Sequence, residues 1–326
     1  MYIENLKFSL WADFIERDYL DKEFKELIAK KIINGATSNP TIFKNAILSS
    51  DAYREQLSNL NGLSPKERYE AVAIFDISKA ADILRPLYNK GDDGYVSIEV
   101  DPSLCNDTKG TIAEGKALFK AINRPNVMIK IPATLAGYEA MEELTSVGIP
   151  VNATLVFKKE QAISCVNAFK RGIYKYNKNV DTVISIFVSR IDRALDVELA
   201  SKGIEIALSG IYNSSRIYAT IEQMGLKGCR ALFASTGVKG GTLKSDYYIE
   251  KLLAYNSVNT APIETIMAFT TNTQKTQSLP IKEEIIKDHF KKIEEAGIDF
   301  DAILEEQISD GLEAFKEAFA ELMEAL

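Results

Sequence analysis

A lysine stands within an apolar run of the chain. Lys130 follows Met128 and Ile129 and precedes Ile131. Burying an unpaired ammonium in such surroundings is costly, and desolvation favours the neutral amine, which can attack a carbonyl carbon. The pattern therefore favours Schiff-base chemistry on Lys130. A buried ion pair with Glu99 that has no catalytic role is the structural alternative, because Glu99 also lies between apolar neighbours.

Further polar side chains interrupt the predicted strands, several of them in pairs two residues apart. Side chains alternate along a strand, so the two members of each pair share one face. If these faces point inward, they form a polar ring at the carboxyl end of a barrel, where barrel enzymes carry their chemistry. The simpler interpretation is that polarity returns where a strand runs into a loop. The pairs are Thr37 with Asn39, Ser97 with Glu99, and Asn152 with Thr154, and Asp13, Lys130, Ser185 and Ser235 hold comparable positions.

The elements that would position these residues follow a regular alternation. Eight short apolar or β-rich runs are separated mostly by longer segments with helical periodicity, which is typical of parallel βα units. Eight such strands close a barrel. The sequence therefore predicts an α/β fold, a (β/α)8 TIM barrel with additional C-terminal helices. The predicted strands are residues 7–14, 33–40, 94–100, 126–132, 149–157, 181–189, 229–235 and 257–262.

The predicted helices have recognisable ends. Ser64, Pro65 and Glu67 form a capping box with proline at the first helical position, and open a helix that runs toward residue 89. Residues 138–148 end at a glycine before a strand, and residues 158–177 place apolar side chains at helical spacing.

The chain is predicted to form one domain over residues 1–326, a length that α/β barrels commonly reach. After the eighth run, residues 271–280 lead into two or three charged amphipathic helices. We expect this C-terminal extension, about residues 280–326, to pack on the barrel.

Charge and cysteine content exclude several classes of protein. The 39 basic and 46 acidic residues give a net charge of −7 without a long run of one sign, so nucleic acid is not an expected partner. Three widely separated cysteines, Cys105, Cys165 and Cys229, predict neither a disulfide framework nor a zinc site. The first 14 residues lack the features of a secretory signal, and nowhere do 18 apolar residues run together. We expect a cytoplasmic protein with no membrane partner.

The single histidine, His289, limits the available chemistry. It lies in a charged helical stretch, residues 285–297, and is predicted to be a solvated surface residue. Catalysis would then depend on Lys, Asp, Glu, Thr or Ser. One distant histidine and scattered carboxylates do not predict a metal site, and residues 237–241 lack the spacing of a nucleotide-binding loop. No cofactor is expected.

The motifs on these strands resemble those of the transaldolase family. Residues 35–43, Gly-Ala-Thr-Ser-Asn-Pro-Thr-Ile-Phe, are similar to the family's second-strand motif, and residues 127–134 followed by Gly137 are similar to its lysine motif. Seven matches in the expected order are far more specific than one. The other five lie at residues 12–13, 99–101, 152–155, 185–190 and 234–237.

The resemblance implies a transferase of the pentose phosphate pathway. Such an enzyme moves a dihydroxyacetone unit from sedoheptulose 7-phosphate or fructose 6-phosphate to glyceraldehyde 3-phosphate or erythrose 4-phosphate. The resemblance implies that Lys130 forms the Schiff base and that Glu99 is its proton partner, acting through a water that Thr154 helps to hold. It also implies that Asp13 takes the proton from the C4 hydroxyl.

The same resemblance implies substrate-binding residues. Arg190 follows the sixth strand, and the loop at residues 235–241 offers glycine N–H groups beside a lysine, which suits a phosphate. Some relatives carry an arginine shortly after the loop serine, where this chain has Lys239 at a different spacing, so a solvated loop lysine is the alternative there. The implied substrate-binding residues are Thr37, Asn39, Asn152, Ser185, Phe187, Arg190, Ser235 and Lys239.

Two other functions remain open at this point. One is a different Schiff-base aldolase on the same barrel, which would release free dihydroxyacetone, although Asp13 favours transaldolase. The other is a non-catalytic binder of sugar phosphates, which would not require Asp13, Glu99, Lys130 and Thr154 together. The sequence leaves monomer and homodimer equally open.

Overall fold

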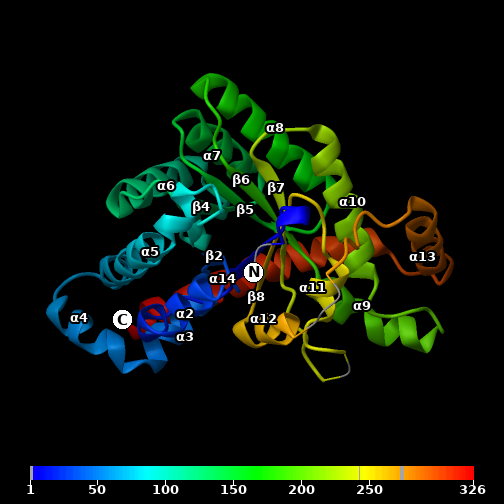
Figure 1. The fold of residues 1–326 in the computed structure, drawn as a ribbon, viewed down its shortest axis with the longest axis horizontal. Helices are drawn as coiled ribbons and strands as arrows, with labels where there is room; N and C mark the ends of the chain where they lie inside the picture. Colours follow the sequence, from blue (N-terminus) through cyan, green and yellow to red (C-terminus); the bar gives the residue numbers. More distant parts are fainter. Residues whose placement is uncertain (1–2, 242, 272–274) are drawn as a thin grey trace.

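The computed structural model describes residues 3–241, 243–271 and 275–326. Residues 272–274, within the predicted connection 271–280, lie outside the described residues. Eight parallel strands pair in sequence order, and β8 closes on β1. Every strand lies within one of the eight predicted runs, so the predicted barrel is confirmed (Figure 1). The strands are β1 (Ser9–Ala12), β2 (Gly35–Thr37), β3 (Val96–Glu99), β4 (Val127–Pro132), β5 (Val151–Val156), β6 (Thr182–Phe187), β7 (Cys229–Ala234) and β8 (Val258–Ala261).

Helices connect the strands on the outside of the barrel and extend the chain beyond β8 (Figure 1). The α-helices are α1 (Arg17–Asp21), α2 (Glu23–Ala29), α3 (Pro40–Ser49), α4 (Arg54–Asn59), α5 (Pro65–Asn89), α6 (Thr108–Ile122), α7 (Leu135–Ser146), α8 (Lys159–Tyr176), α9 (Ser189–Ser201), α10 (Ser209–Met224), α11 (Tyr247–Lys251), α12 (Ile263–Thr270), α13 (Glu283–Glu295) and α14 (Phe300–Ala325). The short 3-10 helices are η1 (Glu4–Leu6), η2 (Asp51–Tyr53) and η3 (Pro102–Asn106).

Local capping explains where several helices begin. The predicted capping box of α5 is confirmed: the Ser64 side chain accepts from the Glu67 backbone N–H, and the Glu67 side chain accepts from the Ser64 N–H. The Asn39 side chain accepts from the Ile42 N–H at 2.9 Å and starts α3 directly after β2. Such caps satisfy backbone donors that the first helical turn leaves without partners.

A largely buried ion pair lies at the amino end of the barrel. The Arg230 guanidinium donates to both carboxylate oxygens of Asp93, at 2.8 and 3.1 Å. The Trp11 indole N–H donates to the same carboxylate at 2.9 Å. These hydrogen bonds match the charges of Arg230 and Asp93 at the amino end of the barrel, where both residues also line a cavity of about 190 Å³.

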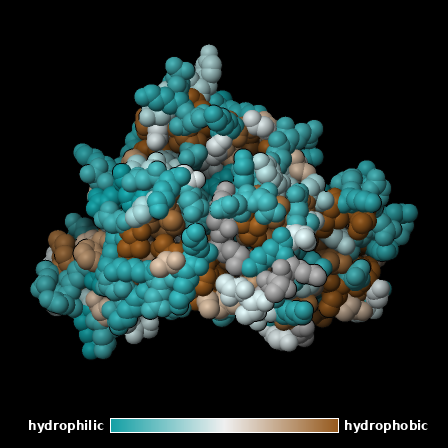
Figure 2. Space-filling model, in the orientation of Figure 1, coloured by the Kyte–Doolittle hydropathy of each residue, from teal (hydrophilic) through white to brown (hydrophobic). Residues whose placement is uncertain are grey.

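The last helix, α14, lies against several parts of the barrel. It contacts α3, α5, η3, β5 and α9. In Figure 1 it runs in red from the C-terminus beside α3 toward α13 on the opposite side of the molecule. The face in Figure 2 is largely hydrophilic, with hydrophobic side chains in separate patches. None of the helices in the described ranges has the length and apolar character needed to span a membrane.

The prediction for His289 was wrong. Its side chain is buried, with 5% of its surface exposed, between α13 and α10. Its Nε2 lies 2.8 Å from the Ser209 hydroxyl, and its ring meets those of Tyr212 and Phe290 edge to face. The charged neighbours of His289 concealed this packing, because they occupy the other faces of the same amphipathic helix. Burial lowers the pKa of His289.

Candidate active site

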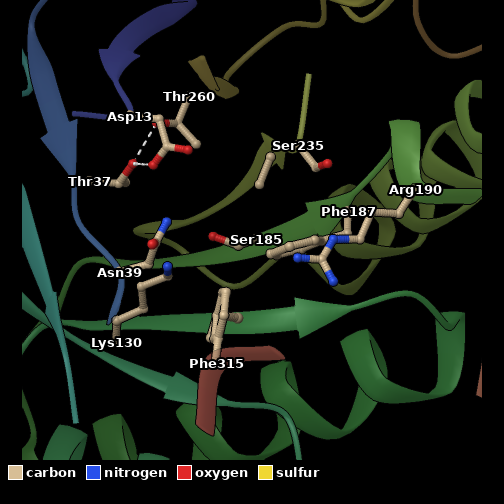
Figure 3. Close-up of a pocket in the computed structure, with 12 residues that line it drawn as sticks. Asp13, Thr37, Asn39, Lys130, Ser185, Phe187, Arg190, Ser235, Thr260 and Phe315 are labelled. Carbon is tan, nitrogen blue, oxygen red and sulfur yellow. Dashed lines mark hydrogen bonds between the residues drawn. The ribbon is translucent and has the colours of Figure 1, made fainter. Parts of the chain in front are cut away.

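The carboxyl ends of the strands surround a cavity of about 120 Å³, shown in Figure 3. Residues of β2, β4, β5, β6, β7 and β8 line it together with residues that follow β1, β2 and β7. α9 contributes Arg190, and α14 contributes one ring from outside the barrel. The lining residues are Asp13, Thr37, Asn39, Lys130, Thr154, Ser185, Phe187, Arg190, Ala234, Ser235, Thr260 and Phe315.

Lys130 is the buried cation of this cavity. Its side chain is 6% exposed, and its Nζ lies 3.1 Å from Glu99 Oε2. The register of β3 and β4 pairs these two residues directly, which brings their side chains together. Nζ also donates to the Ser38 carbonyl at 3.2 Å. The amine is therefore fixed between strands β2, β3 and β4 and faces the cavity (Figure 3).

Two carboxyl groups share the surroundings of Lys130. Burial raises the pKa of Glu99 above its usual range, an effect that the Lys130 charge opposes and the Asp13 charge reinforces. Burial also raises the pKa of Asp13, against the effects of Lys130 and of a hydrogen bond from Thr37. Both carboxylates are therefore stronger bases than exposed ones, which suits them to proton transfer.

Asp13 is oriented by hydroxyl groups from neighbouring strands. The Thr37 hydroxyl donates to Asp13 Oδ1 at 2.7 Å and lies 2.6 Å from the Thr260 hydroxyl (Figure 3). Since the single Thr37 proton is directed to Asp13, Thr260 must donate in the second contact. A chain of two threonines thus holds one oxygen of Asp13.

An irregularity in β5 accompanies Thr154. The pairing of β5 with β6 shifts between Ala153 and Val156, and Leu155 has a φ of 57°, in the left-handed region. Bulges of this kind re-aim side chains next to active sites. The buried Thr154 hydroxyl has no hydrogen-bond partner among the described residues. It is therefore suited to hold a water or a ligand hydroxyl in the cavity.

Ser185 is supported from inside the barrel. Its hydroxyl donates to Asn152 Oδ1 at 2.7 Å, and the Asn152 amide donates to the Ser97 hydroxyl at 3.3 Å. Asn152 and Ser97 are fully buried and do not line the cavity. Asn152 is thus placed to orient Ser185, which reaches the cavity itself.

Arg190 supplies the cation at the other end of the cavity. It lies 5.4 Å from the centre of the Phe187 ring, and both side chains line the cavity (Figure 3). Within the described part of the chain, Arg190 takes part in no ion pair of 4 Å or less, so it is available to an anion. Burial, aided by the nearby Arg193 charge, lowers the pKa of Arg190.

The loop after β7 contributes Ser235 to the cavity, and this residue has a φ of 55°. Lys239, in the same loop, is exposed and does not line the cavity.

Comparison with known proteins agrees with this geometry. The family model described as transaldolase/fructose-6-phosphate aldolase matches residues 10–326. The chain belongs to this family. A transaldolase from Campylobacter jejuni subsp. jejuni serotype O:23/36 (strain 81-176) is 46% identical over 330 aligned positions. The alignment covers 98% of this chain and 99% of the relative. One from Helicobacter pylori (strain Shi470) is 43% identical over 318 residues, covering 97% and 98%. The protein is therefore an enzyme of the transferase class, as the sequence predicted.

This transaldolase-family enzyme gathers most of the predicted site residues around one cavity. Glu99 and Asn152 lie behind it, in contact with Lys130 and Ser185, and only Lys239 stands apart. Those that line the cavity are Asp13, Thr37, Asn39, Lys130, Thr154, Ser185, Phe187, Arg190 and Ser235.

Three lining residues of this transaldolase-family cavity were not predicted: Ala234, Thr260 and Phe315. Thr260 had a signal, because it is a polar residue within the eighth predicted strand, like Thr37 in the second. Ala234 is a small apolar residue whose side chain carries no functional group, so nothing in the sequence predicted it. Phe315 had no local signal, since an aromatic on an amphipathic helix most often packs in a core. No group of three or more His, Cys, Asp or Glu residues in the described ranges is arranged to hold a metal ion.

Proposed function

We propose that the enzyme is a transaldolase that acts through a Schiff base on Lys130. It transfers a dihydroxyacetone unit from sedoheptulose 7-phosphate or fructose 6-phosphate to glyceraldehyde 3-phosphate or erythrose 4-phosphate. The observation that carries the proposal is the buried Lys130 amine, which faces a cavity and lies 3.1 Å from Glu99, with Asp13 on the cavity wall. We place the reaction in the pentose phosphate pathway of the cytoplasm, and assign it to one domain formed by residues 1–326.

Glu99 serves the formation of the Schiff base. Its carboxylate accepts the ammonium proton from Lys130, and the neutral amine then attacks C2 of the ketose. The resulting carbinolamine must lose its hydroxyl as water, which requires a proton donor within reach. Glu99 returns the proton through a water held by Thr154, whose buried hydroxyl has no other partner in the described chain.

Asp13 serves the cleavage of the carbon chain. Its carboxylate takes the proton of the C4 hydroxyl, the C3–C4 bond breaks, and C4 leaves as the aldehyde carbon of an aldose phosphate. The electron pair of that bond moves toward the iminium nitrogen and leaves an enamine on Lys130. In the second half of the reaction this enamine attacks the aldehyde of the acceptor, and Asp13 returns the proton to the new hydroxyl. Water then adds to C2 of the new iminium, and the C2–Nζ bond breaks to release the product ketose and free Lys130.

The remaining polar residues hold the substrate. The hydroxyls of the three-carbon unit are bound by Thr37, Asn39 and Ser185, with Asn152 fixing Ser185 from behind. The side-chain oxygen of Asn39, Oδ1, accepts the hydrogen bond that caps α3. The side-chain NH₂ group of Asn39 is therefore the part offered to the substrate.

The phosphate is bound at the other end of the cavity. Arg190 and Ser235 hold it there, with Phe187 forming an apolar wall beside them. Lys239 reaches the phosphate only if its loop moves, because it is exposed and away from the cavity.

Borohydride trapping tests the proposal. Reduction in the presence of fructose 6-phosphate should leave an adduct on Lys130, identified by peptide mass spectrometry, and Lys130→Met should abolish it. Lys66→Met, at a partly exposed ion pair with Asp101 and Glu114, is the matched control and should leave the adduct intact. An adduct on another lysine, or none, would contradict the proposal.

Product analysis separates the alternatives. Transfer to erythrose 4-phosphate as the main outcome supports a transaldolase, whereas free dihydroxyacetone as the main product indicates an aldolase. Saturable sugar-phosphate binding that survives Lys130→Met without turnover would indicate a non-catalytic binder.

A further inference from the structure

Phe315 brings the C-terminal helix into the active-site cavity. Its side chain lines the cavity with only 4% of the residue exposed, and the centre of its ring lies 5.6 Å from Lys130 Nζ. Figure 3 shows the ring rising from α14 between Lys130 and Phe187. The described chain thus places an aromatic ring from outside the barrel next to the amine.

α14 is fixed on both sides of Phe315. Toward its C-terminus, Phe319 packs against Tyr69 with ring centres 5.3 Å apart. Toward its N-terminus, Glu305 accepts from Lys158 at 2.7 Å. Between them the helix lies tight on β5, because a Cβ added to Gly311 would come within 2.9 Å of a Leu155 methyl group. These contacts hold the part of α14 that carries Phe315 against the cavity.

We propose that the Phe315 ring shields the covalent intermediate on Lys130 from water. The C-terminal helix thereby determines how the bound three-carbon unit is divided between an acceptor aldose and water. This inference rests on the proposed function, because it concerns the enamine that the proposed reaction leaves on Lys130.

The two fates of the enamine differ in what its carbon meets first, an acceptor aldehyde or a proton delivered by water. In transfer, the enamine carbon forms a bond to the acceptor aldehyde, and water then adds to C2 of the new iminium and releases the longer ketose. In hydrolysis, that carbon takes a proton to give an iminium, water adds to C2, and the C2–Nζ bond breaks to release dihydroxyacetone and the free amine. A phenyl ring at this position has no polar atom to hold the attacking water.

The ring also suits the charge on Nζ. The nitrogen is positive in the iminium, and a cation within about 6 Å of an aromatic centre is stabilised by the ring face. Phe315 thus meets the charged intermediate without bringing water to it. A polar side chain at the same place would supply a hydrogen-bond partner for water and bring a proton source to the enamine before the acceptor arrives.

The test compares two phenylalanines on one helix. Phe315 and Phe319 lie one turn apart on α14 and are both buried, but Phe319 packs on Tyr69 and does not line the cavity. The measurement is the rate of free dihydroxyacetone release from fructose 6-phosphate, divided by the rate of transfer to erythrose 4-phosphate. Phe315→Ala should raise this ratio by about tenfold, or about 1.4 kcal/mol in relative barrier height. Phe319→Ala should leave the ratio unchanged even if it lowers stability.

Two milder substitutions at Phe315 serve as controls in case Phe315→Ala does not fold. Phe315→Leu retains an apolar side chain and should keep the ratio near that of the unaltered enzyme, whereas Phe315→Tyr adds a hydroxyl that can hold water and should raise it. An unchanged ratio in both Phe315→Ala and Phe315→Tyr, or an equal rise in Phe319→Ala, would overturn the inference. Borohydride trapping is run in parallel: an unaltered enzyme without an adduct on Lys130 defeats the proposed function itself, whereas normal adducts with an unchanged ratio defeat only the role of Phe315.

Discussion

Lys130 Nζ and Glu99 Oε2 lie 3.1 Å apart because the register of β3 and β4 places the two residues side by side. Both side chains are almost fully buried, so little solvent screens their interaction. A pair of this kind can be a structural ion pair or a proton-transfer pair. The cavity on the other side of Lys130 favours the second, since a purely structural pair has no need of open space beside its cation.

Glu99→Gln should separate these two roles. We expect the rate of adduct formation on Lys130 to fall by roughly 10²- to 10⁴-fold, the usual contribution of a positioned acid or base. Removing the countercharge should also cost about 3–5 kcal/mol of stability. The measurements are the time course of borohydride trapping and urea unfolding. Glu114→Gln, at the partly exposed ion pair with Lys66, is the control for stability. Lost stability with an unchanged trapping rate would assign Glu99 a structural role only.

Asp13→Asn should block carbon–carbon cleavage while leaving Schiff-base formation possible. Adduct yield with fructose 6-phosphate should persist, and release of glyceraldehyde 3-phosphate should fall by roughly 10²- to 10⁴-fold. Loss of the adduct together with cleavage would mean that Asp13 acts earlier in the reaction.

The pH dependence of cleavage should reflect the raised pKa values of Asp13 and Glu99. Each carboxyl must be ionised to accept a proton, so activity is lost as pH falls, beginning at a higher pH than for an exposed carboxyl. The two groups interact, and the profile of kcat/KM therefore reports the pair. An acid limb at the position of an ordinary carboxyl would contradict this expectation.

Arg190→Gln should weaken binding of the phosphate. Loss of hydrogen bonds to a charged group costs about 1.5–3 kcal/mol, so KM for fructose 6-phosphate should rise by one to two powers of ten. Trapping with dihydroxyacetone, which lacks a phosphate, should be unaffected. Lys239→Gln is the matched comparison: an equal rise in KM would show that the loop lysine also binds the phosphate.

Asp93→Ala should destabilise the barrel far from the active site. It leaves the Arg230 guanidinium without its carboxylate and the Trp11 N–H without its acceptor, at a cost of about 3 kcal/mol or more. Asp82→Ala, which breaks the exposed pair with Arg124, should cost less than about 1 kcal/mol. Urea unfolding measures both changes. Equal effects would mean that the barrel-end pair contributes no more than a surface pair.

The sequence by itself determined the barrel and much of the candidate site. Alternation of apolar runs with helical periodicity predicted all eight strands, because burial on both faces demands it. Ser64 and Glu67 fixed the start of α5 through local hydrogen bonds. Lys130 stood out because a charge within an apolar strand requires a partner or a function. These signals depend only on neighbours along the chain.

Only the tertiary structure decided which distant residues meet. Phe315 and Lys130 come together because α14 folds back across the barrel, and no pattern within that helix distinguishes Phe315 from Phe319. His289 is buried because α13 packs on α10, although its sequence neighbours are charged. Lys239 is exposed and does not line the cavity despite its favourable glycines. Periodicity states which face of a helix is apolar, but the surface that this face covers depends on contacts formed over the whole chain.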